Sequence, residues 1–135
     1  MQTLVTFVFK FLAALPLAWL HKLGNLLGGL GFRVLSKDRR RVFENMKLAG
    51  LNPTDEAVKK VFRETAKGGL ELPVAFFRRP EEIENLFVSV NGWEHVQTAL
   101  SAGEGLLFIT PHIGSYDLAG RYISQQLPFP LTAMY

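Results

Sequence analysis

The sequence predicts an α/β protein: an N-terminal membrane-anchoring helix, a helical segment, and then the start of a mainly parallel sheet. Three observations carry this prediction. Residues 4–20 are almost entirely apolar, residues 39–77 show helical spacing of apolar positions, and residues 86–135 read as β-α-β-α-β. The 135 residues suffice for one modest domain with an attached segment. We place the anchoring segment at residues 1–35 and the domain at residues 36–135.

The N-terminal apolar run, LVTFVFKFLAALPLAWL, is interrupted by Lys10 and Pro16. As one helix it would be about 26 Å long, close to the roughly 30 Å hydrocarbon core of a bilayer. No basic residue precedes the run and Lys10 splits it, which argues against a cleaved signal peptide. A buried core helix remains an alternative. We interpret the run as a membrane anchor, spanning or half-inserted, because Trp19 and its basic neighbours are typical of the headgroup level.

Charge and composition restrict the partners. The net charge of +3 and the pI near 9.4 favour an anionic surface, but no basic stripe with interleaved aromatic residues predicts binding to nucleic acid. Lys37 and Arg39 to Arg41 follow the apolar run and favour membrane lipids on the cytoplasmic side. The absence of cysteine excludes a thiol nucleophile and a cysteine-ligated zinc site. Since no histidine has metal-ligand spacing, we expect neither a metal nor a cofactor.

Two helices are expected in the middle of the chain. Residues 39–49 form a short amphipathic pattern that ends at Gly50. Thr54 is a suitable N-cap for a second helix, which reaches toward Phe77. We expect that second helix to be kinked or broken near Pro73.

The C-terminal third alternates short apolar runs with helical patterns. We expect strands at 86–90 and 106–110 and the start of a third at 131–135, with helices at 93–102 and 115–126 between them. Right-handed crossovers would make these strands parallel. Three parallel strands cannot cover both of their faces, so we expect the sequence to be the N-terminal part of a larger domain.

The most informative residues follow the second expected strand, in LLFITPHIGSYDLAG. His112 would lie at the carboxyl end of that strand, where open α/β sheets place their sites. Asp117, five residues later, would lie in the first turn of the next helix and could fix the imidazole tautomer, leaving the other nitrogen as a general base. Gly114 relaxes the backbone between them, and Ser115 begins a helix whose free N–H groups face a developing oxyanion.

Each of these residues also has a purely structural interpretation. An aspartate in a first helical turn is stabilised by the helix dipole alone, and a loop histidine is often only a surface residue. Arg78 and Arg79 are candidates for binding acceptor phosphates, although an exposed basic pair before a proline is more often solvated. No GxSxG nucleophile elbow occurs, so direct acyl transfer between two bound substrates is the simpler chemistry.

The PHIGSYD segment resembles the His-X4-Asp/Glu motif of the lysophospholipid acyltransferase superfamily. The apolar N-terminus, RRRVFENMKLAG and NGWEHVQTALSAGEGLLFITPHIGSYDLAG are similar to its lipid A late-acyltransferase branch, of the lauroyl and myristoyl type. Pro111 stands where the glycerol-phosphate branch tends to have asparagine, which favours the lipid A branch.

The resemblance implies a general base at His112 with Asp117 as its partner. It implies an acyl-acyl carrier protein donor, a lipid A precursor as acceptor, and a site at the cytoplasmic face of the bacterial inner membrane. Two alternatives stay open: a related acyltransferase that acts on a lysophospholipid or glycolipid, and an inactive membrane-associated fragment.

Overall fold

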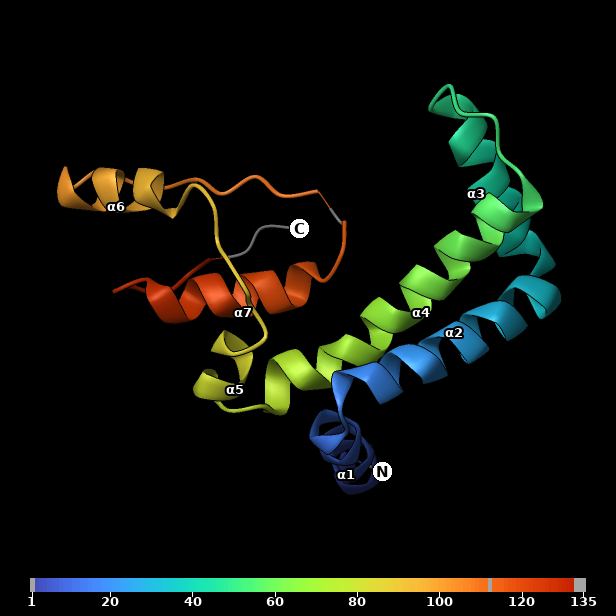
Figure 1. Ribbon diagram of the computed structural model, residues 1–135, viewed down its shortest axis with the longest axis horizontal. Coiled ribbons are helices and arrows are strands. Elements are labelled where there is room, and N and C mark those ends of the chain that lie inside the picture. Colours follow the sequence, from blue (N-terminus) through green and yellow to red (C-terminus); the bar gives the residue numbers. More distant parts are fainter. Residues whose placement is uncertain (1, 112, 133–135) are drawn as a thin grey trace. The chain divides into compact units, whose positions relative to one another are not determined.

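The computed structural model describes residues 2–111 and 113–132, and the regular elements in these ranges are helices (Figure 1). The chain separates into two compact units, Met1–Phe77 and Arg78–Tyr135. The first unit holds four helices and the second holds three shorter ones within the described residues. Each unit has its own buried apolar side chains.

The first unit is organised around its longest helix, α4 (Asp55–Phe77). The other three are α1 (Gln2–Ala14), α2 (Leu17–Val34) and α3 (Ser36–Leu48), and all three contact α4. The contact with α2 is the most extensive, and the two helices lie side by side (Figure 1). The largest fully buried side chains of the unit are Leu20, Val58, Pro73 and Val74.

The apolar N-terminal run folds as two helices because the chain breaks at Pro16. This proline precedes α2 with φ −54° and ψ 138°, and Leu15 closes the end of α1 by donating its N–H to the carbonyl of Leu12 (3.1 Å). The chain direction changes by 116° at the break. No single helix among the described residues is long and apolar enough to cross a membrane, whereas the bent pair passes the same criterion together.

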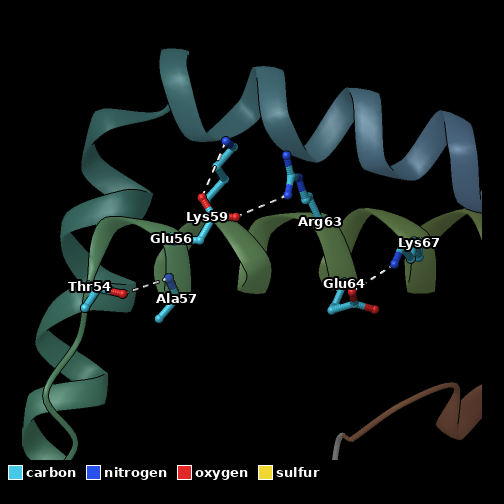
Figure 2. Close-up of polar contacts among 7 residues, drawn as sticks. All are labelled: Thr54, Glu56, Ala57, Lys59, Arg63, Glu64 and Lys67. Carbon is cyan, nitrogen blue, oxygen red and sulfur yellow. Dashed lines mark hydrogen bonds and ion pairs between the residues drawn. The ribbon is translucent and has the colours of Figure 1, made fainter.

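Helix α4 begins as the sequence predicts. Thr54 accepts a hydrogen bond on its side-chain oxygen from the N–H of Ala57 (3.2 Å), which satisfies one free donor of the first turn (Figure 2). The helix is not broken at Pro73 and continues to Phe77. The prediction of a helix over residues 39–49 is confirmed by α3, which begins three residues earlier, and Gly50 adopts a positive φ of 75° just after it.

The second unit contains α5 (Pro80–Glu84), α6 (Trp93–Ser101) and α7 (Tyr116–Gln126). Helix α5 packs on α7, and each buries one apolar side chain, Ile83 and Leu118. The ring of Tyr122 in α7 lies 4.4 Å from that of Phe87 and 6.5 Å from that of Trp93, measured between centroids. The last two helices lie where the sequence predicts them.

The prediction of an α/β fold with a β-α-β-α-β region is wrong. The described residues contain no strand, and the segments 86–90 and 106–110 are irregular. Their apolar composition is that of strands, but Val88 is fully exposed and Ile109 is 88% exposed. A strand exists only when a second backbone completes its ladder of hydrogen bonds, and neither segment has such a partner among the described residues. Of the third expected strand, residues 133–135 lie outside the described residues.

Candidate functional site

Of the two predicted catalytic residues, Asp117 lies at the start of α7. His112 lies outside the described residues, so its position stays a prediction. On the chain beyond it, Gly114 has a positive φ of 66°, a conformation that glycine adopts without strain. Asp117 lies in the first turn of α7, as the sequence predicts. Its side chain is partly buried, and no hydrogen bond or ion pair joins its carboxylate to another described residue.

Ser115 occupies the N-cap of α7, but its side chain does not cap the helix. Its carbonyl accepts a hydrogen bond from the N–H of Ala119 (3.0 Å), which begins the helical ladder. Its hydroxyl is buried and has no hydrogen-bond partner among the described residues. Such a group costs about 1–3 kcal/mol when it is left unpaired, and it is therefore a candidate for contact with a ligand.

The loop before α7 is held by backbone and side-chain contacts to Pro111. The carbonyl of Pro111 accepts hydrogen bonds from the N–H of Ile113 (2.8 Å) and from the hydroxyl of Thr110 (3.2 Å). Ile113 is itself 78% exposed. The Pro111 carbonyl thus binds the hydroxyl of Thr110 and the backbone of Ile113, and the apolar side chain of Ile113 faces solvent.

The two arginines proposed for phosphate binding lie at the N-terminus of α5. The Glu82 carboxylate accepts hydrogen bonds from the backbone N–H of Arg79 (3.0 Å) and from its Nε (3.2 Å). The backbone bond, followed by the side-chain bond, lowers the pKa of Glu82 from its usual 4.5. The Arg79 side chain is otherwise exposed to solvent. Arg78 is partly buried and makes an interaction of its own. A carboxylate already engages Arg79, and a phosphate there would have to compete with Glu82.

The first unit contains a polar pair that the sequence did not predict. His21 Nε2 of α2 lies 2.5 Å from Glu71 Oε1 of α4, and Glu71 is only 8% exposed. A signal for it exists in the sequence, because Glu71 is the one charged residue in the apolar stretch from Gly68 to Phe77. A single carboxylate in such a stretch needs a partner once it is buried. From its position beside Trp19, the sequence predicts only a residue at the membrane interface for His21.

An apolar cavity of about 330 Å³ also lies in the first unit, between α2, α3 and α4. None of the predicted site residues lines it. Its wall includes Gly28, Gly31, Val42, Val61 and Phe62. The described residues contain no cluster of three or more side chains suited to holding a metal ion.

Comparison with known proteins assigns the chain to a family. The family described as bacterial lipid A biosynthesis acyltransferase matches residues 1–135. Comparisons with curated proteins and with solved structures give no significant match. The family match covers the apolar N-terminus, the basic segment and the PHIGSYD motif together. The chain belongs to the bacterial lipid A biosynthesis acyltransferase family, and it is accordingly a transferase with an acyl donor and a lipid acceptor.

Proposed function

We propose that this protein transfers a fatty acyl chain from an acyl-acyl carrier protein to a hydroxyl of a lipid A precursor. His112 is the general base and Asp117 is its partner. The observation that carries the assignment is the position of Asp117, five residues after His112, in the first turn of α7. Its carboxylate has no partner among the described residues, which leaves it available to accept a hydrogen bond from the imidazole.

The proposed reaction needs one base and no covalent enzyme intermediate. His112 removes the proton of the acceptor hydroxyl, whose oxygen attacks the carbonyl carbon of the donor thioester. The tetrahedral intermediate collapses to the ester, and the proton on the imidazole passes to the departing thiolate of the carrier. Asp117 holds the imidazole in the correct tautomer and stabilises its charged form.

The start of α7 supports stabilisation of the intermediate. The first backbone N–H groups of a helix have no partner within it and carry partial positive charge, which stabilises a developing oxyanion. Gly114 lets the chain enter the helix with a positive φ. The buried hydroxyl of Ser115, unpartnered among the described residues, supplies a further donor for the substrate. Arg78 and Arg79 are proposed to contact acceptor phosphates.

We place this reaction at the cytoplasmic face of the bacterial inner membrane. The distribution of charge supports this location, because residues 1–48 contain eight basic and two acidic side chains. Basic residues beside an apolar segment favour the cytoplasmic side and the anionic headgroups there. The exposed apolar side chains of α1 and α2 support contact with lipid.

The test is acyl transfer by the His112→Ala and Asp117→Asn variants, with an acyl-acyl carrier protein and a lipid A precursor. We expect His112→Ala to lose about 10²–10⁴ in rate, because a general base is removed. The matched control is His95→Ala, since His95 is an exposed residue of α6. Activity of His112→Ala within a few-fold of the control would exclude His112 as the base.

A panel of acceptors tests the substrate class. The proposal predicts that the lipid A precursor is the preferred acceptor, and that lysophospholipids and glycolipids react slowly. Faster transfer to a lysophospholipid, still dependent on His112, would keep the mechanism and change the substrate.

A further inference from the structure

Helix α1 exposes an apolar stripe that α4 does not cover. Leu4, Phe7 and Phe11 recur at helical spacing on one side of the helix and are 67%, 68% and 58% exposed. The side toward α4 is different, since Ala13 is buried and the ring of Phe9 meets that of Phe77 edge-on at 6.4 Å. A third side carries the polar residues, Thr3, Thr6 and Lys10.

Helix α2 repeats this division into three sides. Leu20, Gly24 and Gly28 are buried on the side toward α4. The apolar stripe consists of Trp19, Leu26, Leu30 and Val34, which are between 53% and 69% exposed. The polar side carries Lys22, Asn25 and Arg33. A helix such as α2, with an apolar face and a basic polar face, suits the plane of the membrane interface, and α1 adds one basic residue, Lys10, on its polar side.

The lengths of α1 and α2 are marginal for a crossing. At 1.5 Å per residue, α1 is about 20 Å long and α2 about 27 Å, whereas the hydrocarbon core is about 30 Å thick. With the direction changing by 116° between them, the pair extends only about 26 Å from end to end. Helix α1 therefore falls short of the opposite headgroups, whereas α2, with 18 residues, is at the lower limit of a spanning helix.

The contact with α4 also keeps α2 out of the hydrocarbon core. A Cβ atom on Gly28 would lie 2.5 Å from the Cα atom of Arg63, so the backbones of the two helices touch there. The adjoining part of α4 is highly charged, with ion pairs that include Glu56 to Arg63 (3.4 Å) and Glu64 to Lys67 (2.8 Å) (Figure 2). A basic or acidic side chain at the centre of a bilayer costs about 2.5–3.5 kcal/mol. Moving α2 across the core would carry these charges with it.

We infer that α1 and α2 form an interfacial anchor that enters one leaflet and does not cross the membrane. Both apolar stripes are immersed in the acyl-chain region of that leaflet, which is made of anionic phospholipid. The polar sides and the basic residues of α3 meet its headgroups and water. This inference rests on the proposed membrane association and adds to it that residues 3–34 stay on one side of the bilayer.

The chain has no cysteine, so single cysteines can report its position in the membrane. The experiment uses the full chain in inside-out and right-side-out inner-membrane vesicles, with a membrane-impermeant maleimide as probe. Thr3→Cys and Asn25→Cys place thiols on the two polar sides, and Leu26→Cys places one on the apolar stripe beside Asn25. We expect Thr3→Cys and Asn25→Cys to react in the same vesicle orientation. We expect Leu26→Cys to react at least about tenfold more slowly, because a thiol in the hydrocarbon is shielded from water and does not ionise.

Four other results would overturn the inference. Reaction of Thr3→Cys and Asn25→Cys in opposite vesicle orientations would show that the pair crosses the membrane. Equal and fast rates for Asn25→Cys and Leu26→Cys would show that the stripe of α2 lies in water, and equal and slow rates would show that α2 is surrounded by hydrocarbon, as a crossing helix is. Recovery of the unlabelled chain in the soluble fraction would remove membrane association itself, and the inference with it. The catalytic proposal fails separately, in the acyl-transfer assay of His112→Ala.

Discussion

Gly28 is the residue on which the close approach of α2 to α4 depends. An added Cβ would lie 2.5 Å from the carbonyl oxygen of Phe62 and 2.5 Å from the Cα atom of Arg63. Both are backbone atoms, which cannot rotate away as the end of a side chain does. The neighbouring Gly29 has open space around the same position, with no atom within 4 Å. Of these two adjacent glycines, only Gly29 therefore has space for a larger side chain.

We predict opposite effects for Gly28→Ala and Gly29→Ala. Gly28→Ala should lower the free energy of unfolding by about 1–3 kcal/mol, because the two helices must move apart. Gly29→Ala should leave it unchanged or raise it by up to about 1 kcal/mol, because alanine favours the helix. Chemical denaturation of both variants in the same detergent micelle measures the difference. Equal stabilities would show that α2 and α4 are not in close contact at Gly28.

Glu82 provides a prediction about pH. Hydrogen bonds from the backbone N–H and then from the side chain of Arg79 lower its pKa. A carboxylate with a lowered pKa stabilises the folded state above its unfolded pKa, and this contribution disappears as the pH falls through the lower, folded value. We expect an NMR titration of the Glu82 carboxyl carbon to have its midpoint below 4.5. A midpoint at or above 4.5 would mean that Glu82 does not cap α5 in solution.

At the residue scale, the sequence predicts what depends on near neighbours in the chain. Thr54 caps α4 and Asp117 lies in the first turn of α7, because both positions follow from local helix signals. The His21–Glu71 pair joins residues fifty positions apart, and no local rule identifies such a partner. The catalytic role of His112 stays a prediction based on the motif.

At the element scale, the sequence does not predict which of two prolines, Pro16 or Pro73, breaks its helix. Pro16 ends an apolar helix and begins another, whereas Pro73 lies inside α4, fully buried. Both follow apolar helical residues, and a proline in either place removes one backbone donor. Which of them breaks the chain depends on packing, because burial of the Pro73 ring offsets the lost hydrogen bond. That packing involves residues far apart in the sequence, so the residues next to each proline do not predict it.

The strands were predicted wrongly for a related reason. The segments 86–90 and 106–110 have the β-branched and aromatic residues of buried strands. The composition of one segment, however, does not show whether a second strand pairs with it. In the structure, Phe87 stacks on Tyr122 of α7, and Leu107 is 74% exposed. The helices at α3, α6 and α7 were predicted correctly because a helix satisfies its hydrogen bonds within one segment.

The His21–Glu71 pair links α2 to α4 and yields a prediction for their interface. We expect His21→Ala to lower the free energy of unfolding by about 1–3 kcal/mol, because it leaves a buried carboxylate without a partner. Glu71→Gln should have a smaller effect, since glutamine keeps an oxygen that accepts a hydrogen bond from the imidazole. Urea denaturation of both variants tests this order. No loss of stability in His21→Ala would show that the carboxylate is solvated in the folded protein.

At the scale of the whole molecule, charge is divided unequally along the chain. Residues 1–48 hold eight of the fifteen basic residues but only two of the twelve acidic ones. The remainder, with seven basic and ten acidic residues, is net negative. The modest net charge of +3 thus conceals a strongly basic N-terminal third, which coincides with the exposed apolar stripes of α1 and α2. A surface that is both basic and apolar matches an anionic bilayer better than a neutral one.

Binding of the full chain to phosphatidylglycerol vesicles should therefore exceed binding to phosphatidylcholine vesicles and should weaken as salt is added. Each basic residue near an anionic surface contributes about 1 kcal/mol, so Arg41→Gln should lower the affinity about fivefold. Arg41 is exposed in α3 and pairs only weakly with Asp38, at 3.4 Å. The matched control is Arg121→Gln, an exposed arginine of α7, which should bind as the wild type does. Because the apolar stripes do not respond to salt, residual binding should persist at high ionic strength; complete release would indicate attachment by charge alone.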